Sequence, residues 1–148
     1  MRFISKVVVL TLFVFSALGC QQEFEDISST ASYAGLIGQE FVTTQPLLLY
    51  AITIDQNYAK IVHHYAIMNA PGISGPEVIL SDEVFTGASI TVEKALRCSN
   101  CWFGAPTILL IELQDERLED GVPVYLYGLR LEDDEGRVML DSDFFVQR

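Results

Sequence analysis

Turn-forming residues divide the chain into short apolar segments from Tyr33 onward. Pro71-Gly72, Gly75-Pro76, Asp120-Gly121 and Glu135-Gly136 are such breaks, because glycine and proline supply the backbone angles that tight turns need. The segments between the breaks are rich in Val, Ile, Leu, Tyr, Phe and Thr, and they lack the period and caps of long helices. The predicted strands are Glu40–Thr43, Leu47–Ile54, Tyr58–Met68, Glu77–Leu80, Ser89–Leu96, Thr107–Gln114, Val122–Leu131 and Arg137–Val146.

This spacing predicts an all-β domain of about six to eight strands, built as a small antiparallel sandwich or barrel. In Ser89–Glu93 the residues alternate, so Ile90 and Val92 are expected on one face of a strand. The last three predicted strands follow one another as a meander. The loop that starts at Pro71 and enters the strand at Glu77 resembles hairpins of small SH3-like barrels, although such a loop is also an ordinary structural turn.

The N-terminus has the order of a secretory signal. Arg2 and Lys6 precede an apolar run, Val7–Leu18, that is shorter than the ~20 residues of a membrane-spanning helix. The sequence Ala17-Leu18-Gly19-Cys20 then resembles the cleavage site of bacterial lipoprotein precursors, with Ala17 where that class most often has leucine.

The resemblance implies cleavage before Cys20 and acyl chains, palmitate among them, on the thiol and the new amino group of this cysteine. In a bacterium with two membranes, Gln21 after the cysteine implies the outer membrane, with the domain facing the periplasm. We therefore expect a signal helix at 1–19, a lipidated N-terminus and flexible tether at 20–32, and a single β domain at 33–148. A tether of this length has an r.m.s. reach of roughly 20 Å.

The mature protein is expected to be strongly acidic. Removal of Arg2 and Lys6 reduces nine basic residues to seven against 20 acidic ones, so the formal charge changes from −11 to −13. Such a surface repels nucleic acid and anionic headgroups, which argues against a nucleic-acid partner. It suits a basic protein partner, or it serves only to keep the protein soluble.

Cys98-Ser-Asn-Cys101 is the strongest local motif. With Cys20 assigned to lipid, the other two cysteines form an even pair in an oxidising compartment, and a disulfide that closes the turn between two strands is the favoured interpretation. A redox-active pair or a zinc site is the alternative. Trp102 and Phe103 follow directly, either packed over the disulfide or exposed as recognition residues.

His63 and His64 are the only histidines, and as neighbours on a strand they are expected to point to opposite faces. They are read as one solvated and one partly buried side chain, with a catalytic base or a pH-responsive role as the alternative. No nucleophile elbow, His-Glu-x-x-His motif or phosphate loop occurs, so neither an enzyme nor a cofactor or metal is predicted.

Two further sets of side chains are candidates for binding. Tyr125 and Tyr127 share one face of a predicted strand, where they belong either to the core or to an aromatic binding surface. Asp141 and Asp143 share a strand face near the C-terminus and are candidates for an acidic interaction patch, whereas Glu132–Gly136 is read as a solvated hairpin tip rather than a calcium loop.

The sequence therefore predicts a lipid-anchored envelope protein whose β domain is a binding or assembly module. An inhibitor or immunity protein that neutralises a basic enzyme is the second hypothesis, because charge complementarity favours fast association. An envelope enzyme using His63 or His64 is the third.

Overall fold

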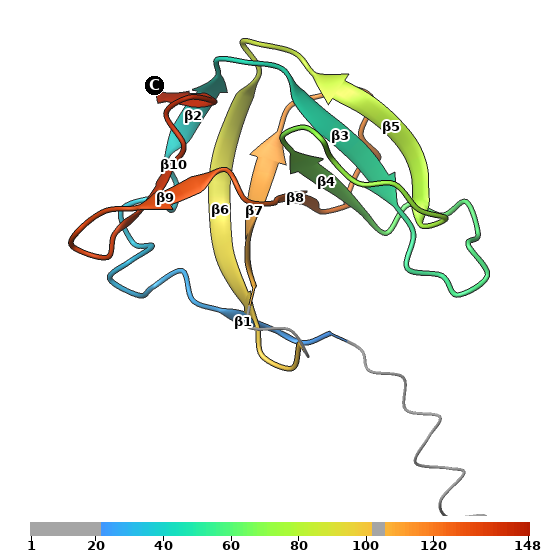
Figure 1. The fold of residues 1–148 in the computed structure, drawn as a ribbon, viewed down its shortest axis with the longest axis horizontal. Helices are drawn as coiled ribbons and strands as arrows, with labels where there is room; N and C mark the ends of the chain where they lie inside the picture. The colour runs from blue at the N-terminus through green and yellow to red at the C-terminus, as the bar shows by residue number, and fades with distance from the viewer. Residues whose placement is uncertain (1–21, 102–105) are drawn as a thin grey trace, which may run out of the picture.

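The computed structural model describes residues 22–101 and 106–148, which form an all-β fold, as predicted (Figure 1). No α-helix occurs in these two ranges, so they contain no helix able to span a membrane. The strands are β1 Phe24–Asp26, β2 Glu40–Thr43, β3 Leu47–Ile52, β4 His64–Met68, β5 Val78–Val84, β6 Ser89–Cys98, β7 Thr107–Leu113, β8 Val124–Leu126, β9 Arg130–Glu132, β10 Val138–Leu140 and β11 Phe145–Gln147.

Nine strands form one open sheet in the order β11-β2-β6-β7-β8-β4-β3-β5, with β1 paired to β6 beside β2, and β9 and β10 form a separate hairpin. The sheet is mixed rather than purely antiparallel, because β4 and β8 run parallel. Among the described strands, β5 and β11 end the sheet without meeting, so it does not close into a barrel. The register of β6 against β7 shifts between Val92 and Lys94, and such a bulge bends a strand.

The main hydrophobic core lies on one face of the sheet. Ile90 and Val92 both point into it, so the predicted alternation of β6 is confirmed. The β9–β10 hairpin and the segment that follows β1 complete this core. Its most deeply buried side chains include Leu47, Ile67, Val84, Ile90, Val92, Leu109 and Leu126.

A smaller cluster lies on the opposite face of the sheet, because successive residues of a strand point to alternate faces. Tyr50 and Ile52 of β3 and Ala66 of β4 form its centre, and Tyr127 packs against them. This second face carries the candidate site described below.

The structure differs from the expected flexible tether at 20–32. Phe24–Asp26 form β1, which pairs antiparallel with the end of β6. Ile27, Tyr33 and Leu36 are then buried in the main core, because the turns between β1 and β2 lie over the sheet. The ordered domain therefore begins before residue 33.

Two long predicted strands are each divided into two. Val122–Leu131 breaks where Gly128 and Leu129 both have positive φ, 64° and 53°, so Leu129 turns into the main core instead of sharing a face with Tyr127. Arg137–Val146 breaks at the turn between β10 and β11. The expected meander therefore ends after β7 and β8, because β10 pairs with β9 and β11 pairs with β2.

Candidate binding groove

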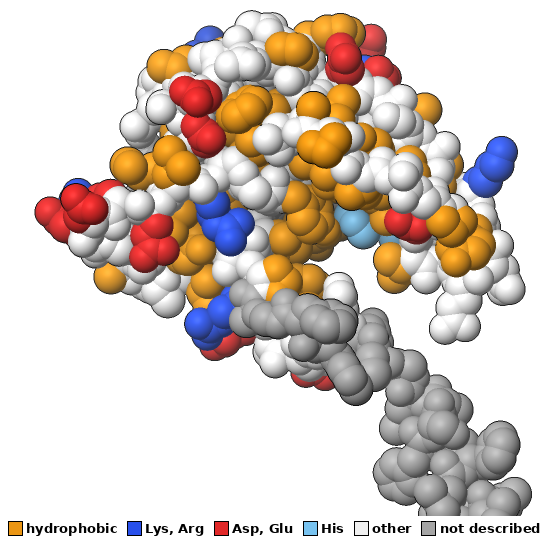
Figure 2. Space-filling view, viewed as in Figure 1, with side chains coloured by type: hydrophobic (Ala, Val, Ile, Leu, Met, Phe, Trp, Pro, Cys, Tyr) orange, Lys and Arg blue, Asp and Glu red, His pale blue; other side chains and the backbone are white. Residues whose placement is uncertain are grey.

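A groove of about 680 Å³ opens on the second face of the sheet. Figure 2 shows the histidine side chains inside a hollow, with hydrophobic side chains around them. We call this feature the aromatic groove. The described residues that line it are Gln22, Phe24, Ile54, Gln56, His63, His64, Ile108, Pro123, Tyr125 and Tyr127.

The parallel pairing of β4 with β8 builds the floor of the aromatic groove. Tyr65 and Ile67 of β4 pair with Val124 and Leu126 of β8, and all four side chains point into the main core. The alternate residues therefore point to the other face. Those residues include His64, Tyr125 and Tyr127, which lie side by side in the groove.

His64 and Tyr125 are in ring contact, with centroids 5.5 Å apart and ring planes inclined by 58°. Burial lowers the pKa of His64 from its usual 6.5, and the nearby His63 lowers it further. Burial raises the pKa of both Tyr125 and Tyr127 above the usual 10.0. At neutral pH the imidazole of His64 and both phenols are therefore uncharged.

The imidazole of His63 contacts the backbone of the loop that follows β3 near both ends of the segment 54–61. Its Nδ1 atom lies 3.0 Å from the carbonyl oxygen of Ile61 and 3.3 Å from the backbone nitrogen of Ile54. With a proton this nitrogen donates to Ile61, and without one it accepts from Ile54. Only the form that accepts from Ile54 ties the start of the segment 54–61 to its end, and Ile54 and Gln56 of this segment line one wall of the groove.

The sequence-based expectation that the two histidines point to opposite faces was wrong. His63 precedes β4 and only His64 belongs to it, so strand alternation does not separate them. Both side chains line the aromatic groove.

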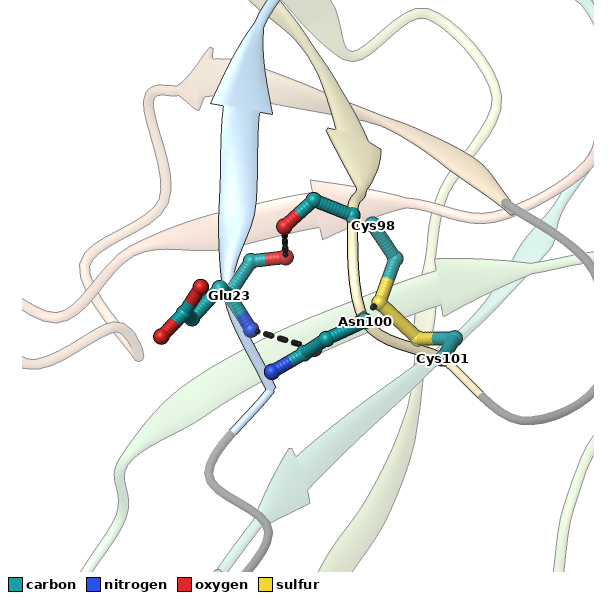
Figure 3. The surroundings of a disulfide bond; sticks show 5 residues. Glu23, Cys98, Asn100 and Cys101 are labelled. Carbon is teal, nitrogen blue, oxygen red and sulfur yellow. Dashed lines mark hydrogen bonds between the residues drawn. A yellow bond between two sulfur atoms is a disulfide. The ribbon is translucent and has the colours of Figure 1, made fainter.

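The opposite wall is formed by the N-terminal strand, and the turn after β6 holds this strand in place (Figure 3). Cys98 and Cys101 form the predicted disulfide, with Cα atoms 5.8 Å apart. Within this turn the side-chain oxygen of Asn100 accepts a hydrogen bond from the backbone N–H of Glu23, at 2.8 Å. The N–H of Ser99 donates to the carbonyl oxygen of Glu23 at 2.9 Å, so both backbone groups of Glu23 are bound.

The candidate residues from the sequence fall into three groups. Tyr125 and Tyr127 lie in the aromatic groove. Asp141 and Asp143 do not share a strand face, because they lie in the turn between β10 and β11, where the Asp141 carboxylate accepts from the N–H of Asp143 at 3.0 Å. The third group, Cys20, Trp102 and Phe103, lies outside the described residues.

Several groove residues were not singled out from the sequence. Phe24 was assigned to the tether. The one signal that could have identified it was an aromatic residue within a polar stretch of sequence. Ile108 is the second residue of β7, a strand that is apolar on both faces, so its pattern did not distinguish the groove from the core. Ile54 and Gln56 lie beyond the end of β3, in a segment whose path has no local signature.

A second hollow, of about 580 Å³, lies between the sheet and the segment that joins β7 to β8. We call it the acidic hollow. Arg117 forms ion pairs with Asp115 and with Asp82 of β5 beside it, and it lowers the pKa of Asp115. The carboxylates that line the acidic hollow are Glu93, Glu112, Asp115, Glu119 and Asp120.

Within residues 22–101 and 106–148 there is no group of three or more His, Cys, Asp or Glu side chains placed to hold a metal ion. Comparison with protein families, with curated proteins and with solved structures found no match to this chain. The function is therefore argued from the groove itself.

Proposed function

We propose that this chain is a lipid-anchored envelope protein that binds an uncharged segment of another envelope protein in the aromatic groove. One observation carries the proposal. The described lining of the groove contains no Asp, Glu, Lys or Arg, although 20 of the 148 residues of the chain are acidic. Aromatic side chains that surround a few polar groups are typical of binding sites.

The lining also fits a binding role rather than catalysis. His64 is in ring contact with Tyr125, and no carboxylate among the described groove residues is available to orient it or to act as a second acid–base group. Tyr125 and Tyr127 offer large surfaces at low conformational cost, and their hydroxyl groups can donate hydrogen bonds. Gln22 and Gln56 add neutral donors and acceptors at the rim.

The proposed anchor is Cys20, close to one wall of the groove. Gln21, Gln22 and Glu23 separate Cys20 from β1, and four extended residues span at most about 14 Å. This is shorter than the reach expected of the twelve-residue tether. Mass spectrometry of the mature protein is expected to find acylated Cys20, and Cys20→Ala is expected to block processing. An N-terminus that begins elsewhere without acyl groups would refute the anchor.

The binding role is tested by crosslinking in cells from a photoreactive phenylalanine analogue at position 127. The matched control carries the analogue at position 139, because Met139 is also an apolar surface residue and lies on the separate β9–β10 hairpin. We expect a specific protein adduct from position 127 that is lost when Tyr125→Ala is added, and none from position 139. Identical adducts from both positions, or none from position 127, would contradict the proposal.

The acidic hollow favours a second candidate function, inhibition of a basic enzyme. Five carboxylates line it, and such a surface attracts a cationic partner from a distance. The association rate with a basic target is then expected to fall steeply with ionic strength. The double variant Glu112→Gln with Glu119→Gln is expected to reduce this association rate. Partners that bind at a rate independent of salt would rule out this function.

A further inference from the structure

We propose that Phe24 and the exposed apolar residues of segment 54–61 form a membrane-contact surface. This surface rests on the bilayer that holds Cys20, so the inference depends on the proposed anchor. It places the mouth of the aromatic groove against the membrane.

The first support is the exposure of large apolar side chains on the two walls of the groove and on the segment that continues one of these walls. In segment 54–61, Ile54 is 67%, Ile61 60% and Tyr58 53% exposed, and Phe24 on the opposite wall is 41% exposed. Ile54 and Phe24 both line the groove, so the two walls present apolar groups on either side of one opening. Apolar residues gathered in this way mark interaction sites, and tyrosine is favoured at membrane interfaces.

The second support is the short length of chain between Cys20 and the first described residues. Gln22 lines the groove, and Cys20 is two residues before it, a distance of at most about 7 Å along an extended chain. Acyl chains on Cys20 therefore enter the bilayer beside the groove. A short connection of this kind keeps the wall formed by β1 close to the headgroups, whatever the orientation of the rest of the domain.

The third support is the charge around this surface. On β1, Glu25 pairs with Arg97 at 2.8 Å and Asp26 pairs with Lys94 at 3.5 Å. In segment 54–61, the carboxylate of Asp55 accepts a hydrogen bond from the N–H of Asn57 at 2.7 Å, and Lys60 of the same segment has the opposite formal charge. With Glu23, which precedes Phe24, the four carboxylates and the three basic residues of this region sum to a formal charge of −1. The membrane-contact surface therefore suits zwitterionic lipid better than the acidic remainder of the domain does.

Depth-dependent quenching tests the proposal on the acylated mature protein in phosphatidylcholine vesicles. An environment-sensitive fluorophore is attached through Ile61→Cys in one sample and through Met139→Cys in a control. The introduced thiol is the only reactive one, because the three native cysteines are taken up by acylation and by the disulfide. A nitroxide on the lipid headgroup is the quencher.

We expect a blue shift and strong quenching at position 61 and neither at position 139. Adding Ile54→Asp is expected to reduce the quenching at position 61, whereas Leu80→Asp, at a similarly exposed apolar residue on β5, is expected to leave it unchanged. Equal quenching at positions 61 and 139, or no quenching at position 61 in a protein with acylated Cys20, would overturn the membrane-contact surface alone. A protein without acyl chains would refute the anchor, and this inference with it.

Discussion

The side-chain oxygen of Asn100 accepts a hydrogen bond from the backbone N–H of Glu23 at 2.8 Å, although 77 positions separate the two residues. This contact connects the disulfide turn to the start of β1. Since β1 forms one wall of the aromatic groove, the turn after β6 determines where the N-terminal segment leaves the domain.

Replacing Asn100 by alanine is expected to loosen β1 without unfolding the sheet. Loss of one hydrogen bond of this kind costs about 1 kcal/mol, so amide exchange at residues 23–26 is expected to rise about fivefold. Asn100→Asp keeps an acceptor oxygen and is the matched control. Hydrogen exchange followed by NMR measures the effect, and unchanged protection in Asn100→Ala would show that other contacts hold the strand.

The Cys98–Cys101 disulfide is expected to stabilise the domain modestly. It closes a loop of four residues, for which loop-closure entropy gives about 2 kcal/mol. The double variant Cys98→Ser with Cys101→Ser should therefore unfold at a lower urea concentration, and the reduced parent should match it. Alkylation without reductant is expected to label neither cysteine, and labelling at Cys98 would favour a redox role.

The lowered pKa of His64 predicts a loss of stability on mild acidification. The unfolded chain binds a proton at this histidine near pH 6.5, whereas the folded protein resists it, so the free energy of unfolding is greatest above pH 6.5 and falls as pH decreases through that value. The carboxylates whose pKa is lowered start from 4.5 or less and act in a more acidic range.

Urea titrations at a series of pH values between 8 and about 5 measure this effect. His64→Gln is expected to flatten the stability profile in that range, while the profile below it keeps its slope. A parent profile that is flat, or that rises on acidification, would contradict the assignment.

Two glycines offer a matched test of the smaller hydrophobic cluster around Tyr50, which lies on the same face of the sheet as the groove. Gly72 and Gly87 both have positive φ, 73° and 92°. A Cβ at position 72 would overlap the buried side chain of Tyr50, whereas a Cβ at position 87 meets no atom within 4 Å.

Gly87→Ala is therefore expected to cost only the backbone strain of about 1–2 kcal/mol. Gly72→Ala is expected to cost more, because Tyr50 must also shift and disturb its packing. Thermal unfolding of the two variants gives the comparison. Equal losses of stability would indicate that the loop at Gly72 moves aside easily.

The local pattern of the sequence was sufficient to locate several of the strands, although it missed β1 and began the strand Tyr58–Met68 six residues before His64. Glu40–Thr43 has the predicted bounds, and Ser89 and Thr107 begin strands as expected, because alternation and turn residues are local signals. The division of Val122–Leu131 was not predictable in the same way. Gly128 permits a positive φ, but nothing in the sequence indicates that Leu129 adopts one as well.

The candidate site was only partly predictable. Tyr125 and Tyr127 were singled out, yet their position beside His64 depends on a parallel pairing between strands far apart in the chain. The wall formed by Phe24 was missed because composition alone suggested a tether. The contacts that order this segment come from β6 and from the turn at Asn100, which no local pattern around Phe24 reveals.

The parallel pairing of β4 with β8 also has a consequence for the order of events in folding. The antiparallel pairs β3–β4 and β6–β7 join strands that are neighbours in sequence, whereas β8 and β4 are far apart in the chain, and non-local parallel pairings of this kind are intrinsically slow to form. Because His64 comes from β4 and both tyrosines come with the β8 segment, we expect the aromatic groove to be assembled late. Before β8 adds to the sheet, no strand pairing of the described residues joins β4-β3-β5 to β2-β6-β7, and the groove is incomplete, so ligand binding would report on completion of the fold.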